Sequence, residues 1–293
     1  HYSSRRQRQM CIRDSGIVGE AWAMADWHFG YGLPIGGVIA TDINHGENGG
    51  AISPGAVGFD INCGVRVLAL EATVDDIPNI KKLGGRMAGR IPAGASGKGG
   101  LDIDMPQIRA LTEGGAQAAV EMGIGFDEDL PSLESNGLLE VEDATLSNRA
   151  LERGLRALGT LGSGNHFLEL QSVEKLVDEE TAKHWGLYEG QLLAMIHSGS
   201  RGLGHQVCSE HSRKLEQKYK RTTDGWYAEE YDFTLTDRQL ACAPIHSKEG
   251  QSYLQEMNAA ANFAFANRSA LAHRLREVLR LEMGVDGEAR TLY

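Results

Sequence analysis

Three glycine-flanked segments of the sequence carry side chains of the kinds that bind metal ions. The first, 55–66, reads G-A-V-G-F-D-I-N-C-G-V-R, and the others are 162–169 (G-S-G-N-H-F-L-E) and 196–204 (I-H-S-G-S-R-G-L-G). Each puts an Asp, Cys or His beside glycines and next to an apolar run. Such a residue stands where a buried strand gives way to a tight turn, so the three segments together predict one site.

Four residues are the candidate metal ligands: Asp60, Cys63, His166 and His197. Asp60 and Cys63 are three positions apart, so both side chains can reach one cation around a turn, and an ionised Cys63 could bridge two cations. The set mixes hard and soft donors, which fits Zn²⁺, Fe²⁺ or Mn²⁺ and argues against a pure Ca²⁺ or Mg²⁺ cage. The spacing alone does not name the metal.

Each candidate also has a structural interpretation. A lone buried cysteine usually acts as a small hydrophobic residue, and a lone histidine after a strand is usually a hydrogen-bonded core residue. Repetition favours metal, because three separate turns would otherwise carry ligand types by coincidence. His28 is equally well explained as part of a pocket wall and as a core histidine. The residues predicted to be structural are Cys208, Cys242, His205, His211 and His246.

The turn at 198–202 (S-G-S-R-G) contains groups that bind phosphate: two hydroxyls, backbone N–H groups and one guanidinium. Gly162–Gly164 with Asn165 could bind an anion in the same way beside the metal. Neither is a P-loop, since no G-K-[ST] follows, and the dinucleotide-binding motif fails because G-S-G-N-H runs into a strand. Each turn by itself is weak evidence for a function.

The composition is that of a globular protein, and we predict a cytoplasmic one. Of the 293 residues 41% are hydrophobic and 24% charged, and no apolar run approaches the roughly 20 residues that span a bilayer. The four cysteines form no CxxC pair, so reduced thiols are expected rather than disulfides or a zinc ribbon. The net charge of -11 argues against a protein that coats nucleic acid, so any such contact must be local.

The hydrophobic pattern predicts an α+β fold, with mixed β-sheets forming a central core, surrounding helices and no regular βαβ rhythm. Residues 1–15 show no period and carry four arginines, and are predicted to be a disordered or unrelated segment ahead of one folded domain at 16–293. Strands are predicted at 35–40, 64–71 and 192–197; helices at 78–90 with Pro78 in the first position, 105–122, 147–158 with Ser147 as N-cap, 173–184, 204–220 and 251–283; an acidic linker at 126–146; and irregular structure at 222–250.

Five longer blocks carry a resemblance to a known family. They read M-A-D-W-H-F-G-Y-G-L-P-I-G-G-V, S-P-G-A-V-G-F-D-I-N-C-G-V-R, G-T-L-G-S-G-N-H-F-L-E, I-H-S-G-S-R-G-L-G-H-Q and E-M-N-A-A-A-N-F-A-F-A-N-R. In this order they closely resemble the successive blocks of the RtcB-type RNA ligases. The likeness covers about residues 21–293, and its D-I-N-C-G and G-N-H-F blocks are highly specific.

The resemblance implies a Mn²⁺- and GTP-dependent ligase that joins an RNA 3′-phosphate or 2′,3′-cyclic phosphate end to a 5′-hydroxyl, with tRNA halves or damaged RNA as substrates. It implies that Asp60, Cys63 and His166 hold one Mn²⁺, and that Cys63 bridges to a second Mn²⁺ held also by His197. An enzyme histidine would accept GMP and pass it to the RNA 3′-phosphate. The residues implied to line the guanine nucleotide are Asn165, His166, Phe167, Leu168 and Glu169.

The sequence departs from the family pattern at both ends. The N-terminal part that family members carry ahead of the M-A-D-W-H-F-G block is replaced by the unrelated residues 1–15. The sequence stops at A-R-T-L-Y, where the family continues with a D-V-x-H-N block whose histidine completes the second metal; the GMP-accepting histidine is expected further on, beyond Tyr293. We therefore predict a truncated fragment that cannot form the GMP adduct alone. One alternative function is a metal-dependent phosphoesterase acting on cyclic phosphate ends without a nucleotide. Another is a noncatalytic RNA-binding relative, against which the dense ligand set speaks.

Overall fold

The computed structural model of the protein describes residues 16–94, 100–223, 225–284 and 289–292, apart from the side chains of residues 25 and 26. The chain divides into two compact units. The first contains the described residues up to 61 together with 141–147 and 204–258, and the second contains those of 62–140, 148–203 and 259–292. The segment predicted at 1–15 lies outside the described residues.

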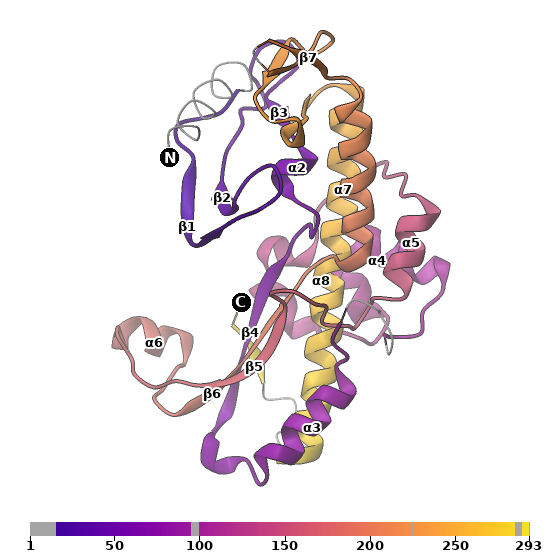
Figure 1. Ribbon diagram of the computed structural model, residues 1–293. Helices are drawn as coiled ribbons and strands as arrows, with labels where there is room; N and C mark the ends of the chain where they lie inside the picture. The colour runs from indigo at the N-terminus through magenta and orange to yellow at the C-terminus, as the bar shows by residue number, and fades with distance from the viewer. Residues whose placement is uncertain (1–15, 95–99, 224, 285–288, 293) are drawn as a thin grey trace. The chain divides into compact units, whose positions relative to one another are not determined.

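A four-stranded antiparallel sheet organises the second unit (Figure 1). Its strands follow the order β11–β4–β6–β5, so strands distant in sequence are neighbours in space. The strands predicted at 64–71 and 192–197 are confirmed as β4 and β6. The bounds are Gly64–Thr73 for β4, Phe167–Ser172 for β5, Gln191–Ser198 for β6 and Arg290–Thr291 for β11.

The register of this sheet brings the three glycine-flanked turns to one edge. His197 of β6 is paired with Val65 of β4 on one side and with Phe167 of β5 on the other. Because both pairings are antiparallel, the beginnings of β4 and β5 lie beside the end of β6. Cys63, just before β4, and His166, just before β5, therefore reach the same edge as His197.

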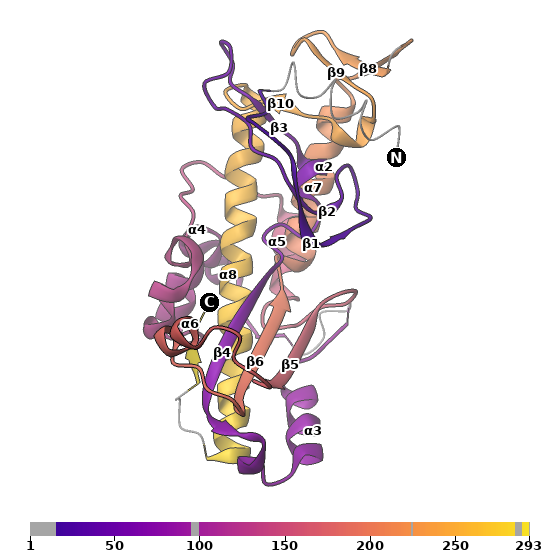
Figure 2. The same ribbon diagram turned by 90° about the vertical axis from the view of Figure 1, so that its left-hand side faces the viewer.

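One face of the sheet forms the core of the second unit. Along β6 the buried residues Leu192, Ala194 and Ile196 alternate with half-buried ones, the two-residue period of a strand with one covered face. The covered face packs against the second half of helix α8, Lys248–Met283, and Figure 2 shows β4, β6 and β5 side by side along that helix. Burial of each such Leu or Ile side chain contributes about 1.5–3 kcal/mol to the stability of the fold. The strand ends that carry the candidate ligands are therefore held by a stable core.

Three of the remaining helices of the second unit, α3, α4 and α6, begin at side-chain caps. Asn79 caps the N-terminus of α3, where its side chain accepts from Lys82 N at 3.0 Å, so Pro78 precedes the cap and is not the first helical residue as predicted. Asp104 caps α4. The bounds are Ile80–Arg90 for α3, Met105–Glu121 for α4, Asn148–Leu155 for α5, Glu179–Trp185 for α6, and Val74–Asp76, Asp127–Ser132 and Glu134–Gly137 for the 3₁₀ helices η1, η2 and η3.

Two further predictions about this unit are corrected. The helix predicted to start at 173 begins only at Glu179, because Val173 still exchanges backbone hydrogen bonds with the start of β6 and Asp178 provides the cap. The acidic segment at 126–146 is more than a linker. It contains η2 and η3, and the Asp129 carboxylate is buried.

The first unit is built from short sheets around a second apolar cluster. Residues 222–250, predicted to be irregular, include the strands β8 and β9: β8 pairs with β7, and β9 pairs with β8. These short strands form because Phe233 and Leu235 are buried together with Leu215 and Tyr219. Helix α8 begins at Lys248, three residues before the predicted start. The bounds are Trp22–His28 for β1, Ile35–Val38 for β2, Ala51–Ile52 for β3, Pro54–Val57 for α2, Arg201–Glu216 for α7, Lys220–Thr222 for β7, Gly225–Ala228 for β8, Phe233–Leu235 for β9, Arg238–Leu240 for η4 and Ala243–Pro244 for β10.

The fold class is α+β, as predicted: helices are combined with several antiparallel sheets. Among the described residues no helix has the length and apolar character needed to cross a membrane.

Candidate metal centre

The thiol of Cys63 lies between two imidazoles. Its Sγ is 3.3 Å from Nε2 of His166 and 3.1 Å from Nε2 of His197, and the two ring centroids are 5.6 Å apart. Metal–ligand bonds of about 2.0–2.3 Å place neighbouring ligand atoms about 3–4 Å apart around one ion. Both contacts of the sulfur are therefore of the length expected between ligands that share a cation.

Asp60 joins this group through the turn that it shares with Cys63. One ligand atom each from Asp60, Cys63 and His166 lies within 4.8 Å of the others, and this is the only such group of His, Cys, Asp or Glu among the described residues. His197 is connected to the group through its own contact with Cys63. A carboxylate, a thiol and two imidazoles thus fit a divalent transition-metal ion, and the central sulfur could serve two ions.

The backbone fixes the tautomer of His166. Its Nδ1 is 2.9 Å from the carbonyl oxygen of Leu161. A carbonyl oxygen only accepts, so Nδ1 carries a proton, and in the neutral ring Nε2 turns its lone pair toward Cys63. Ligating histidines commonly have this arrangement, in which the second nitrogen orients the ring.

Gly162 makes room for that ring. Its φ is +115°, and a Cβ atom there would overlap Nδ1 of His166 and lie 2.7 Å from Nη1 of Arg201. A side chain would thus strain the backbone and displace the imidazole.

We expect Gly162→Ala to weaken metal binding about 10–100-fold while the protein stays folded, since it moves a ligand without removing it. Equilibrium dialysis against Mn²⁺ measures the loss. Gly164→Ala is the matched control: Gly164 has φ +79° in the same turn, yet its Cβ would meet nothing within 4 Å. Equal losses in both variants would show that backbone strain, rather than displacement of His166, is responsible.

The residues implied to line a nucleotide, 165–169, run from the Gly162 turn into the first residues of β5. Asn165 and Glu169 are exposed, and the Phe167 ring meets the His197 ring edge-on at 5.2 Å between centroids. Leu168 packs partly against the core, which restricts its contact with a ligand. The nucleotide assignment of these residues stays a prediction.

The turn at 198–202 is less open to anions than its sequence indicates. Ser198 is buried, and its hydroxyl donates to the Leu161 carbonyl at 2.7 Å. The half-buried Arg201 donates from Nη2 to the Gly94 carbonyl at 3.2 Å. Ser198 therefore serves the loop that orients His166, and Arg201 is the better placed of the two for a phosphate.

The residues predicted to be structural have contacts outside the metal group. Cys208 is buried, donates to the Pro54 carbonyl at 3.3 Å, and has its pKa raised to about 11 by burial. Nε2 of His211 lies 3.2 Å from Oε2 of Glu256, and both side chains are buried. His28 is exposed at the end of β1, so its interpretation as a core histidine is wrong. The others also have contacts elsewhere: Cys242 with the Tyr219 hydroxyl, His205 with the Phe59 ring and His246 with the Ile43 carbonyl.

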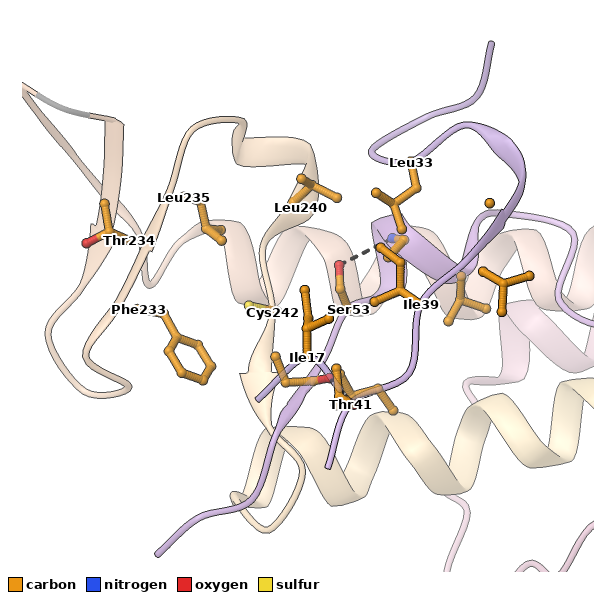
Figure 3. A pocket seen from close by; sticks show the side chains of 16 residues that line it. Ile17, Leu33, Ile39, Thr41, Ser53, Phe233, Thr234, Leu235, Leu240 and Cys242 are labelled. Carbon is orange, nitrogen blue, oxygen red and sulfur yellow. Dashed lines mark hydrogen bonds between the residues drawn. The ribbon is translucent and has the colours of Figure 1, made fainter. Parts of the chain in front are cut away.

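A cavity of about 460 Å³ in the first unit is apolar (Figure 3). Its walls include Leu33, Phe233 and Leu240. The Ser53 hydroxyl accepts from Ala56 N and donates to the Ala241 carbonyl, so it is already satisfied. Among the described residues no charged side chain lines this cavity, and its walls do not contain the ligand set of the candidate metal centre.

Comparison with known proteins identifies the family. The family profile described as tRNA-splicing ligase RtcB matches residues 7–292. The chain belongs to the RtcB family. The observation agrees with the resemblance drawn from the five sequence blocks.

Curated members of the RtcB family are similar over most of this chain. The tRNA-splicing ligase RtcB of Archaeoglobus fulgidus is 43% identical over 297 residues, which cover 97% of this chain and 59% of that protein. The tRNA-splicing ligase RtcB of Methanococcus maripaludis is 46% identical, and the match covers 52% of that protein. The RNA-splicing ligase RtcB of Mycobacterium tuberculosis is also 46% identical, and the match covers 59% of that protein. The chain thus spans little more than half the length of these relatives.

Two residues at the end of the block 256–268, which is shared with the RtcB family, were not predicted to have a role in the site. Asn267 and Arg268 are buried in α8 and hydrogen-bond to the turns around the metal centre. The sequence pattern that indicates them is an Asn-Arg pair within a stretch of alanine and phenylalanine, since polar residues that are buried require hydrogen-bond partners.

Proposed function

We propose that this chain is the metal-binding part of an RNA ligase that uses GTP and Mn²⁺ to join a 3′-phosphate or 2′,3′-cyclic phosphate end to a 5′-hydroxyl end. One observation carries the proposal: in a member of a ligase family, the Cys63 sulfur contacts Nε2 of both His166 and His197. This geometry supports a pair of ions around a shared thiolate, because two imidazoles approach the same sulfur from different strands.

The proposed roles of the residues are supported by the geometry and by the family resemblance. Asp60, Cys63 and His166 would hold one ion, and Cys63 and His197 would contribute to the second. Bound ions would neutralise phosphate charge and align the attacking and leaving oxygens. His166 presents Nε2 because its Nδ1–H donates to the Leu161 carbonyl. The Arg201 guanidinium lies beside Gly162, and the exposed Asn165 belongs to the Gly162 turn, so both suit phosphate and nucleotide contacts.

RNA is the proposed substrate, with tRNA halves or damaged RNA as its sources. The relatives are named as tRNA-splicing or RNA-splicing ligases. The net charge of -11 makes a broad electrostatic attraction to RNA unfavourable. Recognition would thus depend on the metal ions and a few arginines at the RNA ends.

The test is ligation by the protein expressed from its complete reading frame. The substrates are two RNAs, one ending in a 2′,3′-cyclic phosphate and the other starting with a 5′-hydroxyl. We expect joined RNA only when GTP and Mn²⁺ are both present, and His197→Ala should abolish it. His184→Ala, which changes an exposed histidine of α6, is the control and should stay active.

The same assay distinguishes the alternative phosphoesterase. Opening of the cyclic phosphate without GTP, and with no joined product, would support the phosphoesterase and refute the ligase. Metal binding without either reaction would favour the noncatalytic relative.

A further inference from the structure

Two consecutive polar residues of α8, Asn267 and Arg268, are buried in the second unit. Their side chains are 0% and 4% exposed, among apolar neighbours such as Phe263, Ala264 and Leu271. A buried amide or guanidinium is unfavourable unless its hydrogen bonds are satisfied. The partners of these two residues therefore show what the burial accomplishes.

Arg268 connects the Cys63 turn to the end of β6. Its Nη1 donates to the carbonyl oxygen of Asn62 at 2.7 Å and to that of Ser198 at 2.9 Å, and its Nη2 donates to Oδ1 of Asn62 at 3.0 Å. Asn62 precedes Cys63 and has φ 54°. Ser198 follows His197. One planar guanidinium thus fixes the neighbours of two candidate ligands.

Asn267 connects the end of β6 to the loop that orients His166. Its Nδ2 donates toward the Ser198 hydroxyl at 3.2 Å and the Thr160 carbonyl at 3.3 Å, while its Oδ1 accepts from Gly159 N at 2.8 Å. The next residue after Thr160 is Leu161, whose carbonyl accepts from Nδ1 of His166.

Ser198 is the residue at which the two connections meet. Its carbonyl accepts from Arg268, and its hydroxyl accepts from Asn267 and donates to the Leu161 carbonyl at 2.7 Å. The turns of Cys63, His197 and His166 are therefore held in one register by adjacent residues of one helix.

We propose that Asn267 and Arg268 are positioning residues that hold Cys63, His166 and His197 at metal-binding separation without contacting the ion. The proposal rests on the metal centre of the proposed function. Ligand separations of 3.1 and 3.3 Å arise from three turns that are far apart in sequence, so a small shift of any turn opens the set. Rigid contacts from one helix oppose such shifts.

A neighbouring residue separates positioning from general stabilisation. Asn262 is also 0% exposed in α8, and its side chain makes similar hydrogen bonds: Oδ1 accepts from Leu139 N at 2.8 Å, and Nδ2 donates to the Leu139 and Thr112 carbonyls. These partners belong to α4 and the segment after η3, which carry no candidate ligand. Loss of Asn262 should therefore reduce stability alone.

The experiment compares Co²⁺ binding by the chain and its variants, because thiolate ligation gives Co²⁺ a characteristic absorption band. We expect Asn267→Ser and Arg268→Lys to weaken Co²⁺ binding about 10–100-fold and to reduce the thiolate band in folded protein. Lysine retains the charge but cannot span the acceptors of Asn62 and Ser198. Asn262→Ser should lower the unfolding midpoint yet keep Co²⁺ affinity within about twofold, the scale of uncoupled sites.

A gentler variant keeps the proposal testable if Arg268→Lys does not fold. Asn62→Gly tolerates the positive φ and removes only the side-chain bonds to Arg268 and to the Ala261 carbonyl. We expect Asn62→Gly to weaken Co²⁺ binding, though less than Arg268→Lys does, and to leave the unfolding midpoint nearly unchanged.

Each outcome has one interpretation. Unchanged Co²⁺ affinity and band in the folded Asn267, Arg268 and Asn62 variants would overturn the positioning role, as would an equal loss in Asn262→Ser. An unmodified chain that binds no Co²⁺ would refute the metal centre and with it the positioning role. Failure of the ligation assay with normal Co²⁺ binding would refute only the proposed reaction.

Discussion

Replacing Cys63 by alanine is expected to weaken metal binding by more than about 100-fold. Loss of an outer contact to a metal ligand typically costs 10–100-fold, and here the ligand itself disappears. The sulfur contacts both His166 Nε2 and His197 Nε2, so its loss removes a link between two ligand sets. Metal content after equilibrium dialysis against Mn²⁺, and the thiolate band with Co²⁺, measure the effect.

The matched control for this change is Cys242→Ala. Cys242 is a buried thiol in the first unit, packed with Tyr219 and outside the metal group. We expect it to affect stability, through the small loss of packing, and to keep the metal content of the unmodified chain. If Cys63→Ala retains as much Mn²⁺ as Cys242→Ala, the thiol is not a ligand.

The sequence predicts which ligand-type residues come together better than it predicts the strands of the first unit, and the reason is local. A ligand type beside glycine at the end of an apolar run is visible within a few residues, as at Cys63 and His197. Strands β4 and β6 and helix α8 are long and strongly patterned, so their existence was predictable. The order of the sheet, which brings these turns together, depends on the pairing of β4 with β6, whose partners Val65 and His197 are distant in sequence.

The hydrogen-bond partners of buried polar residues could not be predicted from local sequence patterns. Arg268 and Asn267 appear in sequence as polar residues of a helix, and nothing nearby indicates that Asn62 and Ser198 are their partners. The short strands after Lys220 were missed for a related reason: they depend on packing against Tyr219 and Leu215, not on their own weak pattern. The segment 126–146 appears solvated from its charges, yet one of its carboxylates is in the core.

That carboxylate, Asp129, is expected to be the most sensitive acidic residue for stability. Its two oxygens accept from Nη1 and Nη2 of Arg276, both at 2.7 Å, and Oδ1 also accepts from the Thr291 hydroxyl at 2.8 Å. Arg66 lies 4.0 Å away and is almost fully buried. Its pKa falls to about 9, mainly by desolvation and then by Arg268, while Asp129 raises it. One carboxylate thus compensates two buried guanidinium groups.

We expect Asp129→Ala to lower the free energy of unfolding by about 3–5 kcal/mol, the usual result of leaving a buried charge without its partner. Urea unfolding followed by circular dichroism measures it. Glu128→Ala removes the same charge from the adjacent exposed position and should stay within about 0.5 kcal/mol of the unmodified chain. A similar small loss in Asp129→Ala would show that water, not the carboxylate, satisfies the arginines.

A second substitution tests the cause. If the instability of Asp129→Ala comes from uncompensated positive charge, adding Arg66→Met should recover part of the loss, because methionine fills a similar volume without a charge to bury. If it comes from lost hydrogen bonds at Arg276 and Thr291, adding Arg66→Met should lower the stability further. The sign of the coupling between the two substitutions therefore identifies which interaction requires a carboxylate at this position.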